Sequence, residues 1–216
     1  ISLGLVGSEM CIRDRTKGVT ETLLETARKE FLKCGFRGAS LRKISADSGV
    51  STNSIYTRFG DKAGLFAAIV KPAADGLMDI YLESIRTAEG KESISLALEE
   101  GNEGTDRVLE YIYQNLDEFR LIFCESQGTE YENYFDRLTE IEESYYKKFA
   151  GQFTKNPNQP DDFFIHVYCR MGWQYIYELV THEKTYEEAK HFMQNVRVFH
   201  NAGWNAMAEF LNRNAE

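Results

Sequence analysis

Proline, strand-like alternation and long apolar runs are scarce in this chain of 216 residues. Only three prolines occur, at positions 72, 157 and 160, and two of them flank one short polar stretch. Apolar residues instead recur at intervals of three and four positions, the spacing of helices that bury one face. We therefore expect an all-α protein, and its 43% hydrophobic residues are enough for a real core.

Paired cysteines are absent as well. The four cysteines, Cys11, Cys34, Cys124 and Cys169, lie far apart in the sequence and form no Cys-x-x-Cys pair. This pattern excludes a small disulfide-stapled scaffold and favours reduced thiols in a cytoplasmic protein. No apolar run approaches the ~20 residues that a membrane-spanning helix requires, so we expect no membrane partner.

Basic charge is scarce overall but concentrated near the N-terminus. The whole chain carries a formal charge of −9, which by itself argues against nucleic acid as a partner. Residues 16–62 nevertheless hold nine Lys or Arg against five Asp or Glu, a local charge of +4, whereas residues 63–216 carry −13. A basic N-terminal region on an acidic remainder indicates that the two regions have different roles.

Residues 1–15 do not share the pattern of the rest. Glu9 interrupts their apolar run and no basic segment precedes it, so a secretory signal is not expected. We interpret residues 1–15 as a non-native or disordered leader, residues 16–64 as one domain of short helices, and residues 65–216 as a second domain of longer helices.

Local signals place the ends of the short helices. Gly35, Gly49 and Gly60 should end helices, and Ser40, Ser51 and Asp61 should cap the next ones. Proline at position 72 should bend or break the following helix near residue 71. Longer helices are expected at residues 73–88, 93–99, 106–126, 130–153, 162–182 and 186–211, with breaks at 101–104 and 128–129 and the clearest loop at 156–161.

The sharpest signal lies between residues 40 and 62, where two short helices join through a turn that contains Gly49. This spacing predicts a helix-turn-helix unit, whose second helix lies in the major groove of DNA. On that helix, Ile55 and Phe59 are four residues apart and should pack against Ile44 and Val50. The opposite face carries hydrogen-bonding side chains, namely Thr52, Asn53, Tyr56 and Thr57.

These polar residues suit contacts with DNA. An asparagine such as Asn53 pairs with adenine, and a threonine methyl group contacts the thymine methyl. The Tyr56 hydroxyl suits a phosphate, and Arg42 suits a phosphate or a guanine edge. Lys62 begins the next helix, where unpaired N–H groups already favour an anion. The alternative is that these residues form only a polar surface, because helix-turn-helix spacing alone gives many false matches. The local positive charge favours DNA binding.

Residues 20–65 resemble the DNA-binding domain of TetR-family transcriptional regulators. The resemblance is carried by Phe31 with Gly35-Phe36, by the runs from Ser40 to Ser45 and from Gly49 to Ser51, by the run from Ile55 to Phe59, and by Asp61-Lys62 with Leu65-Phe66. Arg58 stands where many members have histidine. The rest of the chain is similar to the family only in length and helical character.

The resemblance implies a homodimer that binds a palindromic operator in double-stranded DNA, as a repressor, and that leaves it when an unknown small-molecule inducer enters the C-terminal domain. It implies no cofactor. Residues 16–64 then form the helix-turn-helix DNA-binding domain, and residues 65–216 form a helical bundle for ligand binding and dimerisation. By position, the expected DNA contacts are Ser40, Arg42, Thr52, Asn53, Ser54, Tyr56, Thr57 and Lys62.

Aromatic residues gather in the acidic remainder, since 22 of the 28 in the chain lie within residues 101–216. Ordinary core packing explains any one of them, but the excess of tyrosine over isoleucine and valine favours a pocket with hydroxyl groups for an amphipathic or aromatic inducer. The residues expected to line it are Tyr111, Phe119, Phe123, Tyr134, Tyr145, Tyr168, Trp173 and Tyr177.

The last two helices are the expected dimer interface, by analogy with the family. Two apolar stripes suit a four-helix bundle between subunits: Ile165, Cys169, Gly172, Trp173 and Ile176, and then Phe192, Val196, Phe199, Gly203 and Met207. Packing within one subunit is the alternative, and both can hold on different faces.

An all-α metal or cofactor-binding enzyme of the ferritin-like type is the rival hypothesis. Glu188 and His191 have the Glu-x-x-His spacing of di-iron ligands, but such sites need two of these motifs and two further carboxylates. Only one is present, and no phosphate loop, nucleophile elbow or zinc-protease motif accompanies it. We therefore expect a regulator, not an enzyme, with no metal site.

Overall fold

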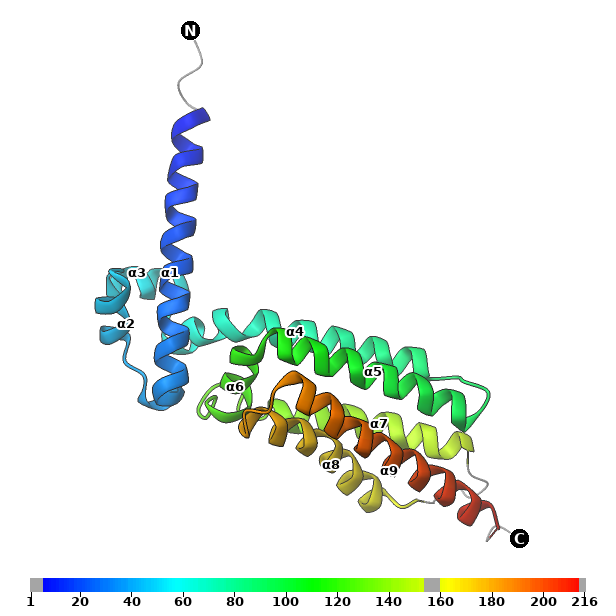
Figure 1. The fold of residues 1–216 in the computed structure, drawn as a ribbon. Helices are drawn as coiled ribbons and strands as arrows, with labels where there is room; N and C mark the ends of the chain where they lie inside the picture. Colours follow the sequence, from blue (N-terminus) through cyan, green and yellow to red (C-terminus); the bar gives the residue numbers. More distant parts are fainter. Residues whose placement is uncertain (1–5, 154–159, 214–216) are drawn as a thin grey trace.

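The computed structural model describes residues 6–153 and 160–213, and the side chains of residues 18–152 and 160–213. These residues form helices and no strand, which confirms the expected all-α class. Figure 1 shows the long α1 with the short helices α2 and α3 at one end, and a longer bundle extending away from them. The domain boundaries themselves stay a prediction.

The N-terminal domain, called the head below, comprises α1 (Val6–Gly38), α2 (Leu41–Ser48) and α3 (Thr52–Phe59). Gly35 adopts a φ of 67° and turns the chain out of the long part of α1, as the sequence predicts. Gly49 ends α2 in the left-handed conformation, where a side chain would be strained. The core of the head consists of fully buried side chains from all three helices, Leu23, Ala27, Phe31, Ile44 and Ile55.

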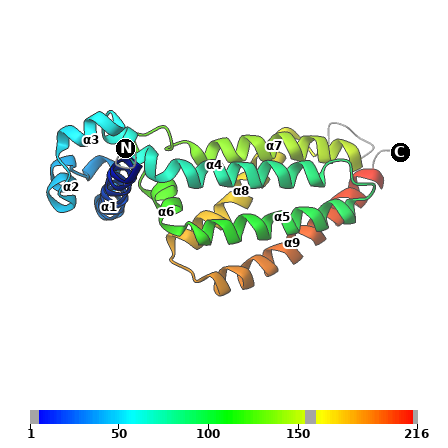
Figure 2. The ribbon, with the colours of Figure 1, turned by 90° about the horizontal axis from the view of Figure 1, so that it is seen from above.

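The second domain, called the body below, comprises α4 (Lys62–Ala88), α5 (Ile94–Gln114), α6 (Leu116–Cys124), α7 (Tyr134–Phe153), α8 (Asp162–Thr181) and α9 (Tyr186–Arg213). Seen from above, α4 runs from the head along the bundle, beside α7 and α5 (Figure 2). The short helix α6 lies at the end of the bundle nearest the head (Figures 1 and 2).

Two expected helix boundaries are wrong. A break at residues 101–104 does not occur, because α5 is continuous and buries Gly104 against α4, where an added Cβ would lie 2.7 Å from that of Ser84. The break falls instead at Asn115, whose side-chain amide donates to the carbonyl of Tyr111 at 2.9 Å. The α4 helix also continues through Pro72, which is exposed, so water can reach the carbonyl that proline leaves unpaired.

The interpretation of residues 1–15 as a leader stays a prediction. Residues 1–5 lie outside the described residues, and residues 6–15 continue α1 upstream of its expected start at residue 17. The expected loop at 156–161 also lies largely outside the described residues.

Candidate functional site

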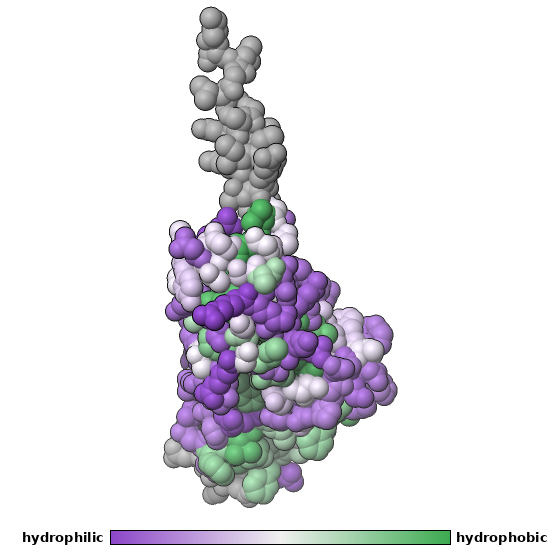
Figure 3. Space-filling model, turned by 90° about the vertical axis from the view of Figure 1, so that its left-hand side faces the viewer, coloured by the Kyte–Doolittle hydropathy of each residue, from purple (hydrophilic) through white to green (hydrophobic). Residues whose placement is uncertain are grey.

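The outer face of α3 presents the polar side chains that the sequence predicts. Asn53, Tyr56 and Thr57 are exposed, with 53% of Tyr56 accessible, while Ile55 on the opposite side is fully buried. The Ser51 hydroxyl accepts from the Ser54 N–H at 3.1 Å and caps the helix. The helix therefore offers an amide, a phenol and a hydroxyl side by side. Seen from the end where α2 and α3 lie, the surface is largely hydrophilic (Figure 3).

A buried carboxylate on α1 holds the start of α2 in place. Glu30 of α1 is only 6% exposed; its carboxylate accepts from the Ser40 N–H at 3.4 Å and pairs with the Lys43 ammonium at 3.3 Å. It thus satisfies one of the unpaired donors at the start of α2, where the helix dipole favours negative charge. On the other side, the Arg58 guanidinium donates to the Thr20 hydroxyl at 2.8 Å and ties α3 to α1.

Three of the expected DNA contacts also have structural roles. The Ser40 hydroxyl accepts from the Lys43 N–H at 3.4 Å and caps α2, and the Ser54 hydroxyl lies 2.9 Å from that of Ser51. The Lys62 ammonium donates to the carbonyls of Arg37 and Ala39, at 3.2 and 3.1 Å, and lies 4.7 Å from the centre of the Phe36 ring. One of its three protons remains for a phosphate.

The remaining expected contacts lie toward solvent on two helices. Arg42 is exposed on α2, Asn53, Tyr56 and Thr57 are exposed on α3, and Thr52 at the start of α3 is half-buried. The Thr57 hydroxyl also donates to the Asn53 carbonyl at 2.9 Å, so several of the expected contacts both support the unit and are accessible to a partner.

Helix α6 joins the head to the body. The Phe36 N–H donates to the carbonyl of Glu125 at 2.9 Å, and the Arg28 guanidinium pairs with the Glu118 carboxylate at 2.7 Å. Phe66 of α4 lies within ring contact of Phe31 in the head and of Tyr131 in the body, at 5.2 and 6.3 Å. The head and the body are thus in direct contact at α4 and α6.

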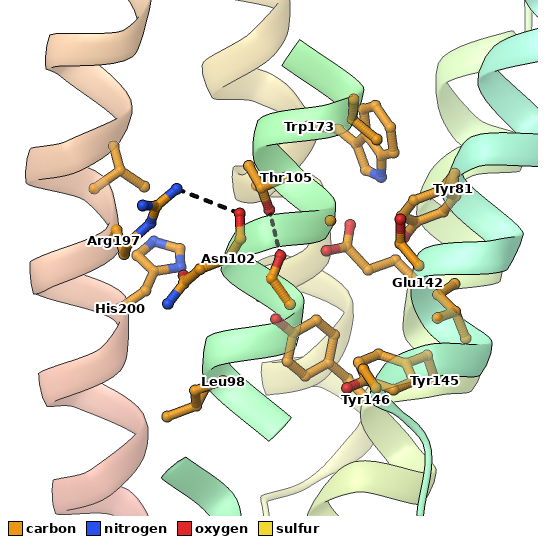
Figure 4. Close-up of a pocket in the computed structure, with 18 of the residues that line it drawn as sticks. Tyr81, Leu98, Asn102, Thr105, Glu142, Tyr145, Tyr146, Trp173, Arg197 and His200 are labelled. Carbon is orange, nitrogen blue, oxygen red and sulfur yellow. Dashed lines mark hydrogen bonds between the residues drawn. The ribbon is translucent and has the colours of Figure 1, made fainter. Parts of the chain in front are cut away.

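The body encloses a cavity of about 160 Å³ that is lined from α4, α5, α7, α8 and α9 (Figure 4). Its walls are mainly aromatic, and the rings of Tyr145 and Tyr146 lie 5.3 Å apart. Tyr81 of α4 meets Trp173 of α8 edge to face, with ring centres 5.1 Å apart. An apolar pocket with a few inward polar groups has the character of a small-molecule site.

The polar groups at one end of this pocket are under-satisfied. The buried Tyr81 hydroxyl and Trp173 indole N–H have no hydrogen-bond partner among the described residues. The Glu142 carboxyl lies near both and points into the pocket (Figure 4), and no cationic side chain in the described part of the chain pairs with it. Burial raises the pKa of Glu142 to about 8, and the nearby indole N–H of Trp173 opposes part of that rise.

At the other end of the pocket, the polar side chains find their hydrogen-bond partners within the chain. The Arg197 guanidinium donates to the Asp106 carboxylate at 2.5 Å and to the Asn102 carbonyl at 3.3 Å. His200 Nδ1 lies 2.7 Å from the Tyr168 hydroxyl, and burial lowers the pKa of this histidine. These groups position α9 against α5 and α8.

Only three of the residues expected to line a pocket do so, namely Tyr145, Tyr168 and Trp173. The structure places the other five outside it: Tyr111, Phe119, Phe123 and Tyr134 belong to the main core, and Tyr177 packs against Phe123 and Phe135. The Tyr134 hydroxyl, for example, donates to the Ala74 carbonyl at 2.7 Å. Aromatic content predicts burial, but burial alone does not distinguish a core from a pocket wall.

Sequence reasoning missed Glu142, and the signal was present. Leu138, Tyr145 and Phe149 mark the buried face of α7, and Glu142 occupies the same stripe at helical spacing. A carboxylate in an apolar stripe is costly unless something pairs with it, which marks a functional position. Tyr81, Tyr146, Arg197 and His200 were missed without a comparable signal.

The Glu-x-x-His motif has a structural role at the start of α9. The Glu188 carboxylate accepts from the N–H and hydroxyl of Thr185, at 2.8 and 3.0 Å, and the Glu188 N–H donates back to that hydroxyl at 3.3 Å. This reciprocal pair is a capping box, and it lowers the pKa of Glu188. Among the residues that the structure describes, no three His, Cys, Asp or Glu side chains come together as metal ligands.

A search of the described helices for a segment long and apolar enough to cross a membrane finds none.

Comparison with known proteins supports the reading of the head. Residues 23–69 match the model of the family described as bacterial regulatory proteins, tetR family. Over 71 residues the chain is 31% identical to the transcriptional repressor AcnR of Corynebacterium glutamicum, and over 95 residues it is 28% identical to AcnR of Corynebacterium efficiens. These matches cover 33% and 40% of this chain and 38% and 50% of the relatives, so the chain spans half or less of the curated relatives that it matches.

Solved structures are similar over the body as well. A protein from Syntrophomonas wolfei, described as a TetR-family transcriptional regulator, matches with a TM-score of 0.59 and 17% identity, over 87% of this chain and 96% of its own. A transcriptional regulator from Pseudomonas aeruginosa matches with a TM-score of 0.52 and 18% identity, over 84% and 91%. These likenesses concern the fold, whereas the family match rests on the head. The N-terminal domain thus matches the family of bacterial regulatory proteins described as tetR over residues 23–69, and the relatives matched by sequence are transcriptional repressors.

Proposed function

We propose that this protein is a transcriptional repressor that binds operator DNA through α3 as a homodimer and is released by a small molecule bound in the body. The observation that carries the proposal is the outer face of α3, where Asn53, Tyr56 and Thr57 are exposed over a buried Ile55. An amide and a hydroxyl can read base edges, and a phenol can reach a phosphate, once the helix enters a major groove.

Helix α4 supports the link between ligand and DNA. It begins at Lys62, which holds the turn after α1, and it contributes Tyr81 to the wall of the pocket. Ligand binding that favours one position of α4 would favour one position of the head. In a dimer the two α3 helices must lie ~34 Å apart to enter successive major grooves, so a changed separation weakens operator binding.

An exposed apolar face on α8 and α9 supports the dimer. Phe163, Val167, Val198 and Phe199 are exposed, with 69% of Phe199 accessible, and an apolar groove between the two helices is lined by Met171, Gly203 and Met207. The α8 stripe expected at the interface, Ile165, Cys169, Trp173 and Ile176, is instead buried within the subunit. The proposed interface is therefore the neighbouring outer face of α8 together with the Phe199 face of α9.

Selection of bound duplexes from a random double-stranded DNA pool, with the full chain, tests the proposal. We expect enrichment of an inverted repeat, because a two-fold dimer reads two half-sites in opposite orientation. A single unrepeated half-site would overturn the dimer, and weak salt-sensitive binding without any enriched sequence would overturn the repressor function.

Sedimentation of the chain and of its Phe199→Glu variant tests the interface separately. A dimeric chain and a monomeric variant with an unchanged circular dichroism spectrum are expected, because a charge in an apolar interface is left without a partner. An equally dimeric variant would place the interface elsewhere.

A further inference from the structure

We propose that the pocket in the body binds a small organic cation whose ammonium group lies against the Glu142 carboxylate, within walls of tyrosine and tryptophan. The inference rests on the proposed function, for which it names the chemical class of the effector. Figure 4 shows the arrangement on which it depends, with Glu142 between Trp173, Tyr81 and the Tyr145–Tyr146 pair.

The first argument is the missing counter-charge. Glu142 lies among aromatic side chains with no ion-pair partner in the described part of the chain, whereas Glu143, the next residue, pairs with His166 at 2.6 Å on the outside of the helix. The Glu142 side chain is half-buried among aromatic rings. Its ionised form is unfavourable there without a partner, so a cation that supplies one gains that stabilisation on binding. Space is available, because Gly172 faces the carboxylate and adds no side chain: even a Cβ built there would lie 3.7 Å from Oε1.

The second argument is the chemistry of the walls. Tyr81, Tyr145, Tyr146 and Trp173 all line the cavity beside Glu142. The faces of such rings attract ammonium groups, most strongly when water is excluded, and aromatic cages recognise organic cations in this way. The unpartnered Tyr81 hydroxyl can accept a hydrogen bond from an ammonium N–H, a contact that a carboxylate ligand does not offer.

The third argument excludes the opposite charge. Arg197 lines the far end of the pocket, but its guanidinium is already paired with Asp106. His200 has a pKa lowered by burial and is neutral at neutral pH. An anionic ligand would therefore find no free cation in the pocket, and it would hold Glu142 in its protonated, uncharged form.

The cavity sets the size of the ligand. Its volume of about 160 Å³ is close to that of an engineered cavity of ~150 Å³ that holds benzene. One aromatic ring with a short amine arm fits this space. Benzylamine, benzyl alcohol and benzoate then form a matched set of probes that differ in charge and little in shape.

Binding of the cation should release a proton. The free carboxyl, with its pKa near 8, is largely protonated at neutral pH, and a bound ammonium favours its ionised form. The ionisable groups that act on it are Tyr81 on α4, Tyr145 and Tyr146 on α7, and Tyr168 and Cys169 on α8, all with pKa values raised by burial. These groups are neutral below pH 8. The α9 wall adds His200, whose pKa is lowered by burial, and the paired Arg197, so Glu142 is the group whose ionisation we expect to change on binding.

Calorimetry with the full chain and the three probes, without DNA, tests the inference. We expect benzylamine to bind at least about tenfold more tightly than benzyl alcohol or benzoate. Between about pH 6 and about pH 8, where benzylamine remains charged, its affinity should rise at least about tenfold and a proton should be released, measured by comparing buffers of different ionisation enthalpy. Equal binding of the three probes, or preference for benzoate, would overturn the inference.

Two variants of α7 sharpen the test. Glu142→Gln should reduce benzylamine affinity at least about tenfold and abolish proton release, while benzyl alcohol changes by less than about twofold. Glu140→Gln removes the same charge from an exposed position on the same helix and should leave all three affinities unchanged. If Glu142→Gln does not fold, the comparison of the three probes on the unaltered chain still tests the cation site.

The two proposals fail in different ways. A chain that binds benzylamine selectively but selects no DNA sequence retains the cation site and loses the repressor function. A chain that selects an operator but does not discriminate among the probes retains the repressor function and loses the cation site. When both hold, benzylamine should weaken operator binding by the unaltered chain and not by Glu142→Gln.

Discussion

The head and the body each place a glutamate on the inner side of a long helix, and they treat it in opposite ways. Glu30 in the head is held by the Ser40 N–H and by Lys43. Glu142 in the body has no cationic partner among the described residues and faces a cavity. The carboxylate in the head is thus satisfied within the fold, whereas the half-buried carboxyl in the body faces the pocket without a cationic partner among the described residues.

The two regions also differ in net charge. The basic region at residues 16–62 suits a polyanionic partner, and the acidic remainder repels one. The head therefore has the charge that suits DNA, and the two regions are in contact through α4 and α6.

Phe66→Ala should destabilise the head and the body together, because Phe66 contacts both regions. Its ring contacts Phe31 and Phe36 in the head and Tyr131 in the body, and it is fully buried. We expect a loss of about 3–5 kcal/mol in the free energy of unfolding, measured with urea. A loss below about 1 kcal/mol would show that the joint is not closely packed.

Replacing the two glutamates should give effects of opposite sign. Because the folded-state pKa of Glu142 is raised from 4.5 to about 8, its charged form destabilises the fold, and the stability present below pH 4.5 is lost as the pH rises to about 8. Near pH 8, Glu142→Gln should therefore be more stable than the unaltered chain by up to about 4 kcal/mol, and this difference should disappear near pH 4.

Glu30→Gln provides the matched comparison. It weakens two charge-assisted contacts at the start of α2 and should lower the free energy of unfolding by about 1–2 kcal/mol at neutral pH. Urea denaturation at two pH values measures the change in the free energy of unfolding for each variant. Destabilisation by Glu142→Gln near pH 8 would contradict the expected difference in sign.

Asn53→Ala tests whether α3 of the head reads a base through Asn53. Asn53 is exposed on α3 and takes part in none of the side-chain bonds that hold the helix in place. Its removal should cost about 1–2 kcal/mol of discrimination at one base pair of each half-site while the fold stays unchanged. Repeated selection from random DNA would show this as a relaxed position, and an identical motif would mean that Asn53 does not read a base.

The smallest expected effect comes from two buried tyrosines. The Tyr134 hydroxyl donates to the Ala74 carbonyl, whereas the Tyr81 hydroxyl has no partner among the described residues. Tyr134→Phe should lower the free energy of unfolding by about 1 kcal/mol, and Tyr81→Phe should leave it unchanged or raise it slightly. Thermal unfolding of both variants measures the difference, and equal losses would mean that the Tyr81 hydroxyl is satisfied.

Much of the head was predictable because its signals are local. Ser40, Ser51 and Asp61 cap the helices that the sequence assigns to them, and Gly35 and Gly49 end the preceding ones. Burial of Ile44 and Ile55 against exposure of Asn53 and Tyr56 follows from helical spacing alone. Capping, turns and amphipathic spacing depend on neighbours in sequence, so the sequence by itself determined the all-α class and the polar face of α3.

The tertiary structure decided what depends on neighbours in space. Gly104 continues α5 instead of breaking it because Ser84 of α4 lies against it. Lys62 bonds to the carbonyls of a distant turn, and Glu142 lies at a cavity whose walls come from five helices. No periodicity in one helix reveals which helix lies opposite, and for this reason the sequence placed aromatic residues in the body without separating the core from the pocket.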